Sequence, residues 1–173
     1  MMKAMIRGEV KGLFVMGEDI VLSEPNASRV EEGLNAVEFL VVQDIFLTET
    51  SRFAHVVLPA ACFAEKDGVF TNSDRRVQRV RKAVTPPGQA RADWEILCDL
   101  ARACGYPMPE YEGPAAIYAE LSGLCGQFAG ISHERVDREG GLQWPCPSPE
   151  HPGTPTLHEG GPLKGKATFQ GVA

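Results

Sequence analysis

The stretch VVQDIFLTETSRFAHVVLPAACFAEKDGVFTNSDRR, residues 41–76, decides the fold of this chain. Two apolar, β-branched runs stop abruptly here: the run 39–42 meets polar residues, and the run 55–58 meets Pro59. A third run, at 12–16, also ends in polar residues. Continuous apolar runs of this length are typical of strands buried in a parallel sheet. The sequence therefore predicts three neighbouring parallel strands.

Polar side chains follow these runs at the points where the strands would end. Open α/β sheets bind their ligands at the carboxyl edge of the strands. A rim of acceptors suits a ligand rich in N–H and O–H donors, because a carboxylate can accept from both the N1–H and the 2-amino group of guanine, or from ribose hydroxyls. The candidate binding residues are Gly17, Glu18, Asp19, Ser23, Gln43, Asp44 and Asp93.

The same residues have a plainer interpretation. Asp is common at strand ends because it forms turns, so Asp19 and Asp44 could be turn residues and Asp93 only a helix cap. The sequence has neither a G-x-G-x-x-G dinucleotide fingerprint nor a G-x-x-x-x-G-K-[ST] phosphate loop. Spacing alone therefore leaves a nucleotide site and a set of turn residues as open alternatives.

Apolar periodicity predicts alternating helices and strands over the first sixty residues. The predicted elements are a helix at 3–8, a strand at 11–16, a helix at 28–37 capped by Ser28, a strand at 38–42, a short helix at 48–53 capped by Thr48 and a strand at 55–58. Short links between such elements predict right-handed crossovers. The fold class is therefore α/β: an open parallel sheet flanked by helices, in a Rossmann-like three-layer domain.

The pattern changes beyond residue 60. The predicted elements there are an extended piece at 69–72, a loosely alternating stretch at 75–84, a helix at 93–104 with Asp93 as its N-cap, and a helix at 114–124. From residue 140 the chain is rich in Pro and Gly and too poor in apolar runs to hold a core. We expect an α/β domain at 1–139 and an extended arm or inter-domain connection at 140–173. Trp144, Leu157 and Phe169 would dock the arm.

Composition bounds the class of protein. The chain has 173 residues and a net charge of −6, from 17 basic and 23 acidic residues, which argues against a general binder of nucleic acid or anionic membranes. No apolar run approaches the roughly 20 residues of a membrane span, and the first ten residues lack the apolar core of a signal peptide. The five cysteines form no C-x-x-C pair and are expected to be buried or half-buried free thiols. We expect a cytoplasmic location.

Other charged residues are weaker candidates for a binding site. The basic run of Arg75, Arg76, Arg79, Arg81 and Lys82 could clamp a phosphate, but a solvated face or a salt-bridge surface is the simpler interpretation. The loop of Glu65, Lys66 and Asp67 could cover a ligand, although an exposed turn is the simpler interpretation. His55 opens an apolar strand and is expected to be structural. Nothing nominates a nucleophile, a general acid–base pair or metal ligands.

These motifs together resemble a known family. The runs VVQDIFLTET, HVVLPA, AEKDGVFTN, RRVQRVRKAV and DWEI, in this order and spacing, resemble the catalytic alpha subunit of molybdenum- or tungsten-dependent formate dehydrogenases. GLFVMGEDIVLSEPN upstream and GGLQWPCPSPEHPGTPTLH downstream resemble the flanking segments of that family. The resemblance implies an α/β domain that holds the guanosine end of a molybdopterin guanine dinucleotide. Asp19, Ser23, Gln43 with Asp44 beside it, and Asp93 would contact that cofactor, and Asp93 would read the guanine edge.

The resemblance is incomplete. The family's iron–sulfur motif, its Cys or selenocysteine metal ligand with an adjacent His, and its active-site Arg have no counterpart here, and His55 stands where Asp is usual. We therefore expect a domain-sized fragment or a short reading frame, without catalytic residues and unable to oxidise formate alone. Its partners would be the remaining domains of the alpha subunit and electron-transfer subunits, or a second copy of itself. A non-catalytic nucleotide-binding or assembly module is the alternative.

Overall fold

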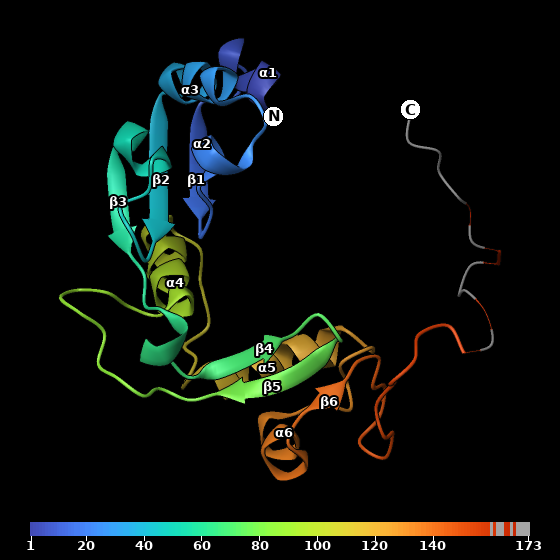
Figure 1. Cartoon of the computed structure of the whole chain (residues 1–173). Coiled ribbons are helices and arrows are strands. Elements are labelled where there is room, and N and C mark those ends of the chain that lie inside the picture. Colours follow the sequence, from blue (N-terminus) through green and yellow to red (C-terminus); the bar gives the residue numbers. More distant parts are fainter. Residues whose placement is uncertain (160, 162–164, 167, 169–173) are drawn as a thin grey trace. The chain divides into compact units, whose positions relative to one another are not determined.

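The computed structural model describes residues 1–159, 161, 165, 166 and 168 (Figure 1). The chain divides into two compact units. The first unit consists of residues 1–67 and 81–110, and the second of residues 68–80 with the chain from 111 onward. The two units therefore alternate along the sequence, whereas the sequence pattern predicts one boundary, at residue 140.

The first unit is built on a parallel sheet of three strands in the order β1-β2-β3. β1 is Gly12–Met16, β2 is Phe39–Asp44 and β3 is Val56–Pro59. Met16 pairs with Gln43, which in turn pairs with Leu58, so the three strands end at one edge. All three arrowheads point toward helix α4, Asp93–Ala103 (Figure 1). The predicted parallel sheet is confirmed.

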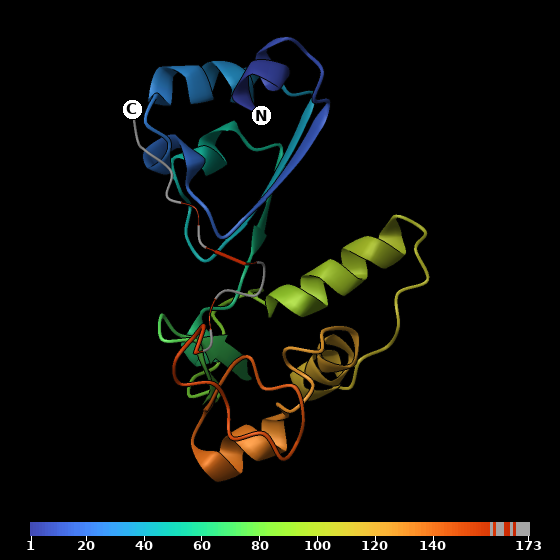
Figure 2. The same ribbon diagram turned by 90° about the vertical axis from the view of Figure 1, so that its right-hand side faces the viewer.

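Helices cover one face of this sheet. Figure 2 shows α1, α2 and α3 together on the same side of the strands. Their bounds are Met2–Ile6, Ile20–Ser23 and Ala27–Ala36, and the 3₁₀ helix η1 follows at Thr50–Phe53. Met5 and Leu34 from these helices are buried against Leu40 and Val42 of β2. Burying one such side chain stabilises the unit by about 1.5–3 kcal/mol, so this cluster anchors the strands whose ends form the polar edge.

Two predicted helix caps are wrong. Asn26, not Ser28, caps α3, because its side chain accepts from the backbone N–H of Arg29 at 3.1 Å. The N-cap of α4 is Ala92, whose N–H donates to the Glu95 side chain at 3.3 Å, and Asp93 is the first helical residue. The Asp93 carboxylate is therefore not used to cap its own helix. The one-turn helix α2 was not predicted, because four residues are too few for a periodic pattern.

The second unit contains a three-stranded antiparallel sheet in the order β4-β5-β6. Its elements are β4 (Gly68–Thr71), β5 (Arg76–Val80), α5 (Pro114–Leu124), α6 (His133–Glu139) and β6 (Leu142–Gln143). Leu142 and Cys146 are buried with Val77 and Val136. Residues 142–146 of the predicted arm thus belong to a packed core, and α5 has the predicted bounds.

Two arginines of the basic run, Arg75 and Arg79, form hydrogen bonds and an ion pair within the chain. Arg75 donates to the backbone oxygens of Trp144, Thr154 and Pro155. Arg79 donates to Gly68 O at 2.7 Å and pairs with Asp137 at 3.1 Å. A solvated face is therefore the wrong interpretation for these two arginines.

The residues predicted to dock the arm differ in their positions. Trp144 packs against Phe128, with a centroid distance of 5.6 Å, and under the Arg75 guanidinium. Leu157 is 39% exposed, and Phe169 lies outside the described residues.

Predictions about the cysteines, His55 and membrane spans can be compared with the structure. All five cysteines are free; Cys98 and Cys146 are buried and Cys62 and Cys125 are half-buried, but Cys104 is exposed, contrary to expectation. His55 accepts from the backbone N–H of Leu40 at 3.0 Å, as expected of a structural residue. Within the described part of the chain, no helix has the length and apolar character needed to cross a membrane.

Candidate functional site

The candidate site lies at the carboxyl edge of the parallel sheet in the first unit. Gly17 follows β1 in the left-handed region, with φ of +63°, a conformation that glycine adopts without strain. Its N–H donates to Gln43 O at 2.9 Å, which ties the loop after β1 to the end of β2. The sheet register and this bond therefore bring the residues around 17 and 43 together.

Asp19 fixes the loops at this edge. Its Oδ1 accepts from the N–H and the hydroxyl of Thr50 at 3.1 and 2.7 Å, and its Oδ2 accepts from Glu49 N–H at 3.1 Å. Burial raises the pKa of this carboxyl, but the hydrogen bonds from Thr50, Glu49 and Leu22 outweigh burial and lower the pKa below its ordinary value of about 3.8. Asp19 is therefore a charged clamp between the α2 loop and η1.

Gln43, Asp93 and Lys66 form the central cluster of the edge. Gln43 is fully buried, and its Nε2 donates to Asp93 Oδ1 at 2.8 Å. Asp93 Oδ2 pairs with the Lys66 ammonium, and the two side chains are 32% and 21% exposed. An exposed turn is therefore the wrong interpretation for Glu65 and Lys66, because Lys66 pairs with Asp93 and the Glu65 side chain accepts from Cys62 N–H at 2.9 Å. Asp67 is exposed, as that interpretation predicts.

Gln43 holds an unsatisfied acceptor. Its Oε1 is buried and has no hydrogen-bond partner among the described residues. The amide cannot be flipped without placing Oε1 against the Asp93 carboxylate, so the orientation that donates to Asp93 is fixed. An orphaned buried acceptor costs about 1–3 kcal/mol, and a donor supplied by a ligand would remove that penalty.

The remaining predicted residues are less engaged. Asp44 accepts from Phe46 N–H at 3.0 Å, as a turn residue does. Glu18 and Ser23 are exposed, with Ser23 at the end of α2. None of these three side chains is hydrogen-bonded to the central cluster in the structure.

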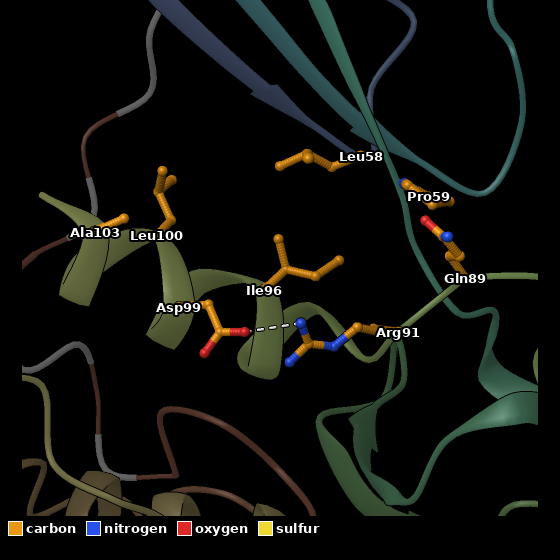
Figure 3. A pocket seen from close by; sticks show the side chains of 8 residues that line it. All are labelled: Leu58, Pro59, Gln89, Arg91, Ile96, Asp99, Leu100 and Ala103. Atoms are coloured by element: carbon orange, nitrogen blue, oxygen red, sulfur yellow. Dashed lines mark hydrogen bonds and ion pairs between the residues drawn. The ribbon is translucent and has the colours of Figure 1, made fainter.

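An apolar hollow lies beside the cluster, between the end of β3 and α4. It has a volume of about 380 Å³ and is lined by Leu58, Pro59, Gln89, Arg91, Ile96, Asp99, Leu100 and Ala103. Ile96 and Leu100 point toward Leu58 (Figure 3). Ile96 lies one turn after Asp93, on the same face of α4. A flat apolar group bound at Asp93 would therefore find an apolar wall next to it.

Two of the residues that line the hollow, Arg91 and Asp99, are joined by an ion pair (Figure 3). Asp99 accepts from Arg91 at 2.7 Å and from Arg102 at 3.0 Å, which lowers its pKa, mainly through the bond from Arg91. Within the described residues, no group of three or more His, Cys, Asp or Glu side chains is placed to hold a metal ion.

Sequence reasoning missed Lys66 as a member of the cluster. The available signal was its position seven residues after Pro59, the last residue of β3, with a charge opposite to that of Asp93. Thr50 was also missed; it is fully buried, and its hydroxyl both donates to Asp19 and accepts from Val21 N–H at 3.2 Å.

This architecture is that of a parallel α/β domain with polar side chains gathered at the carboxyl edge of the strands, where open α/β sheets bind their ligands. The chain belongs to the molybdopterin oxidoreductase family, whose model, described as "Molybdopterin oxidoreductase", matches residues 1–103.

The curated relatives of this chain include formate dehydrogenase and nitrate reductase subunits. The chain is 51% identical over 152 residues to "F420-dependent formate dehydrogenase 2 subunit alpha" of Methanococcus maripaludis, covering 87% of this chain and 22% of that protein. It is 42% identical over 163 residues to "Assimilatory nitrate reductase catalytic subunit" of Bacillus subtilis, covering 91% and 23%. The chain therefore spans about a fifth of the length of the curated relatives it matches.

A solved structure has the same fold. Acetylene hydratase from Pelobacter acetylenicus superposes with a TM-score of 0.65 at 21% identity, over 83% of this chain and 19% of that one. At this identity, the likeness supports the fold alone.

Proposed function

We propose that this chain binds the guanosine end of a molybdopterin guanine dinucleotide, as one domain of a formate dehydrogenase alpha subunit. The parent enzyme would oxidise formate to carbon dioxide. The higher identity to a formate dehydrogenase alpha subunit than to a nitrate reductase favours this choice within the family.

The observation that carries the proposal is the cluster of Gln43, Asp93 and Lys66. A carboxylate has about four lone-pair sites, and Gln43 and Lys66 each use one on Asp93. The remaining sites suit the N1–H and the 2-amino group of guanine, which lie side by side on one edge of the base. Adenine offers an acceptor at N1 and would meet the carboxylate with the wrong polarity.

The residues present fit the nucleotide end of the cofactor. The orphaned Oε1 of Gln43 requires a donor, and the half-exposed Asp93 carboxylate is accessible from solvent. Gly17 and Glu18 follow β1 and Asp44 ends β2, and the proposal has these residues, with Ser23, near the ribose hydroxyls. The molybdenum or tungsten carried by such a cofactor would supply the redox chemistry, and this chain's residues would bind and orient the nucleotide.

Binding of GMP to the purified chain tests the proposal through two matched variants. Asp93→Asn removes the acceptor for guanine, whereas Glu32→Gln removes the same charge from an exposed position on α3 that belongs neither to the cluster nor to the hollow. We expect Asp93→Asn to weaken GMP binding roughly tenfold or more, the value of a lost charged hydrogen bond, and Glu32→Gln to leave it unchanged. The readout is the dissociation constant from amide NMR shifts; equal affinity for all three proteins would refute the proposal.

A further inference from the structure

We propose that Lys66 is a specificity-determining residue of this site and donates to O6 of the guanine that Asp93 holds. The inference rests on the proposed function. It adds a residue that recognises O6, the third polar group on this edge of guanine after N1–H and the 2-amino group. It assigns Lys66 a contact with the ligand, in addition to its ion pair with Asp93.

The first support is the placement of the ammonium. Lys66 lies next to Asp93 Oδ2, in an ion pair whose side chains are 21% and 32% exposed. An ammonium has three N–H donors and Asp93 takes one, so donors remain for a ligand on the open side. Because the other carboxylate oxygen is held by Gln43, the Asp93 side chain cannot turn away from Lys66 without losing that bond.

The second support is the order of donors and acceptors. Lys66 and the two Asp93 oxygens present a donor followed by two acceptors. The edge of guanine presents an acceptor at O6 followed by donors at N1 and the 2-amino group, which is the complementary order. When Oδ2 accepts from N1–H, its neighbour Lys66 faces O6.

The same order rejects adenine at two points. The adenine 6-amino group would face the ammonium, and its N1 lone pair would face the carboxylate. Each mismatch leaves partly buried polar groups without a partner, which is the strongest source of discrimination between similar ligands. Lys66 therefore strengthens the discrimination between guanine and adenine that Asp93 provides.

The test uses GMP and 6-thio-GMP, which keep the same N1–H, 2-amino group and phosphate but differ in the acceptor at position 6. We expect the wild-type chain to prefer GMP over 6-thio-GMP by roughly tenfold, and Lys66→Met to bind the two with equal affinity. IMP, which keeps O6 but lacks the 2-amino group, should lose the same factor relative to GMP in both proteins. Lys82→Met, which removes an exposed charge in the same unit, should keep the wild-type preference.

The experiment distinguishes a failure of the Lys66 proposal from a failure of the proposed guanosine binding. If the wild-type chain binds GMP but does not distinguish 6-thio-GMP, or if Lys66→Met keeps the distinction, the role of Lys66 is refuted and guanosine binding stands. If the wild-type chain binds no guanine nucleotide, the proposed function itself is refuted. The wild-type comparison between the two nucleotides requires no variant to fold, so it decides the question even if Lys66→Met is unstable.

Discussion

Asp19 has a structural role at the sheet edge that its sequence position does not predict. Its position after β1 predicts either a cofactor contact or a turn residue, whereas in the structure its Oδ2 accepts from Glu49 and its Oδ1 from Thr50. Its contribution to binding would therefore come from positioning the loops at the sheet edge.

Replacing Asp19 with Asn should destabilise the chain by about 1–3 kcal/mol, the value of hydrogen bonds to a charged group. Glu18→Gln, which removes an exposed neighbouring charge, should change stability by less than about 0.5 kcal/mol. Urea unfolding measures the free energy of unfolding of both variants.

The stabilisation by Asp19 should depend on pH. Because the folded pKa of Asp19 is lowered, its stabilisation is fully present above the unfolded pKa near 4 and is lost as the pH falls through the folded value. The difference between wild type and Asp19→Asn should therefore shrink below about pH 4; a constant difference from pH 7 to pH 2 would contradict the clamp.

Individual residues also mark the limit of sequence reasoning. Gln43 and Asp93 were both assigned to the sheet edge, because strand ends and helix starts are readable from local patterns. The bond between them and the pairing with Lys66 were not predicted. They depend on the path of residues 60–66 and on α4 beginning at Asp93, which tertiary packing decides.

At the scale of elements, the α5–α6 connection contains two glycines with opposite surroundings. A Cβ on Gly130 would lie 2.0 Å from the backbone oxygen of Ser148, whereas a Cβ on Gly126 would meet nothing within 4 Å. The N–H of Gly130 also donates to Cys146 O at 2.7 Å, so the segment around Cys146 is pressed directly onto this glycine.

Gly130→Ala should therefore destabilise the second unit by about 3 kcal/mol, the upper end of the range for overpacking a tight site, because backbone must move. Gly126→Ala, the matched control, should change stability by less than about 0.5 kcal/mol. Thermal unfolding followed by circular dichroism compares the two. Equal stability of both variants would show that residues 146–148 do not pack on Gly130.

Most elements were predictable from local sequence, including the short strands β3 and β4, whereas α2 and β6 were not. The helix at 114–124 and the three parallel strands follow from apolar spacing and from Pro114. β6 has only two residues and lies in a Pro/Gly-rich stretch, so its pairing with β5 could not be inferred from local sequence. The expectation of an extended arm beyond it remains a prediction.

At the scale of the whole molecule, the chain belongs to the molybdopterin oxidoreductase family and spans about a fifth of its curated relatives. Formate oxidation, the guanine dinucleotide form of the cofactor, the other alpha-subunit domains as partners and the cytoplasmic location all remain proposals. Phe46 and Leu47, 71% and 84% exposed in the loop after β2, are available for contacts with such domains or with a second copy.

The most direct test of the central claim is an amide NMR titration of the wild-type chain with GMP, with AMP as the control. We predict shifts with GMP only, confined to Gly17–Ser23, Gln43–Asp44, Lys66 and the start of α4 at Asp93. Equal shifts with both nucleotides, or a folded spectrum that GMP leaves unchanged, would contradict guanosine recognition at the edge of this sheet.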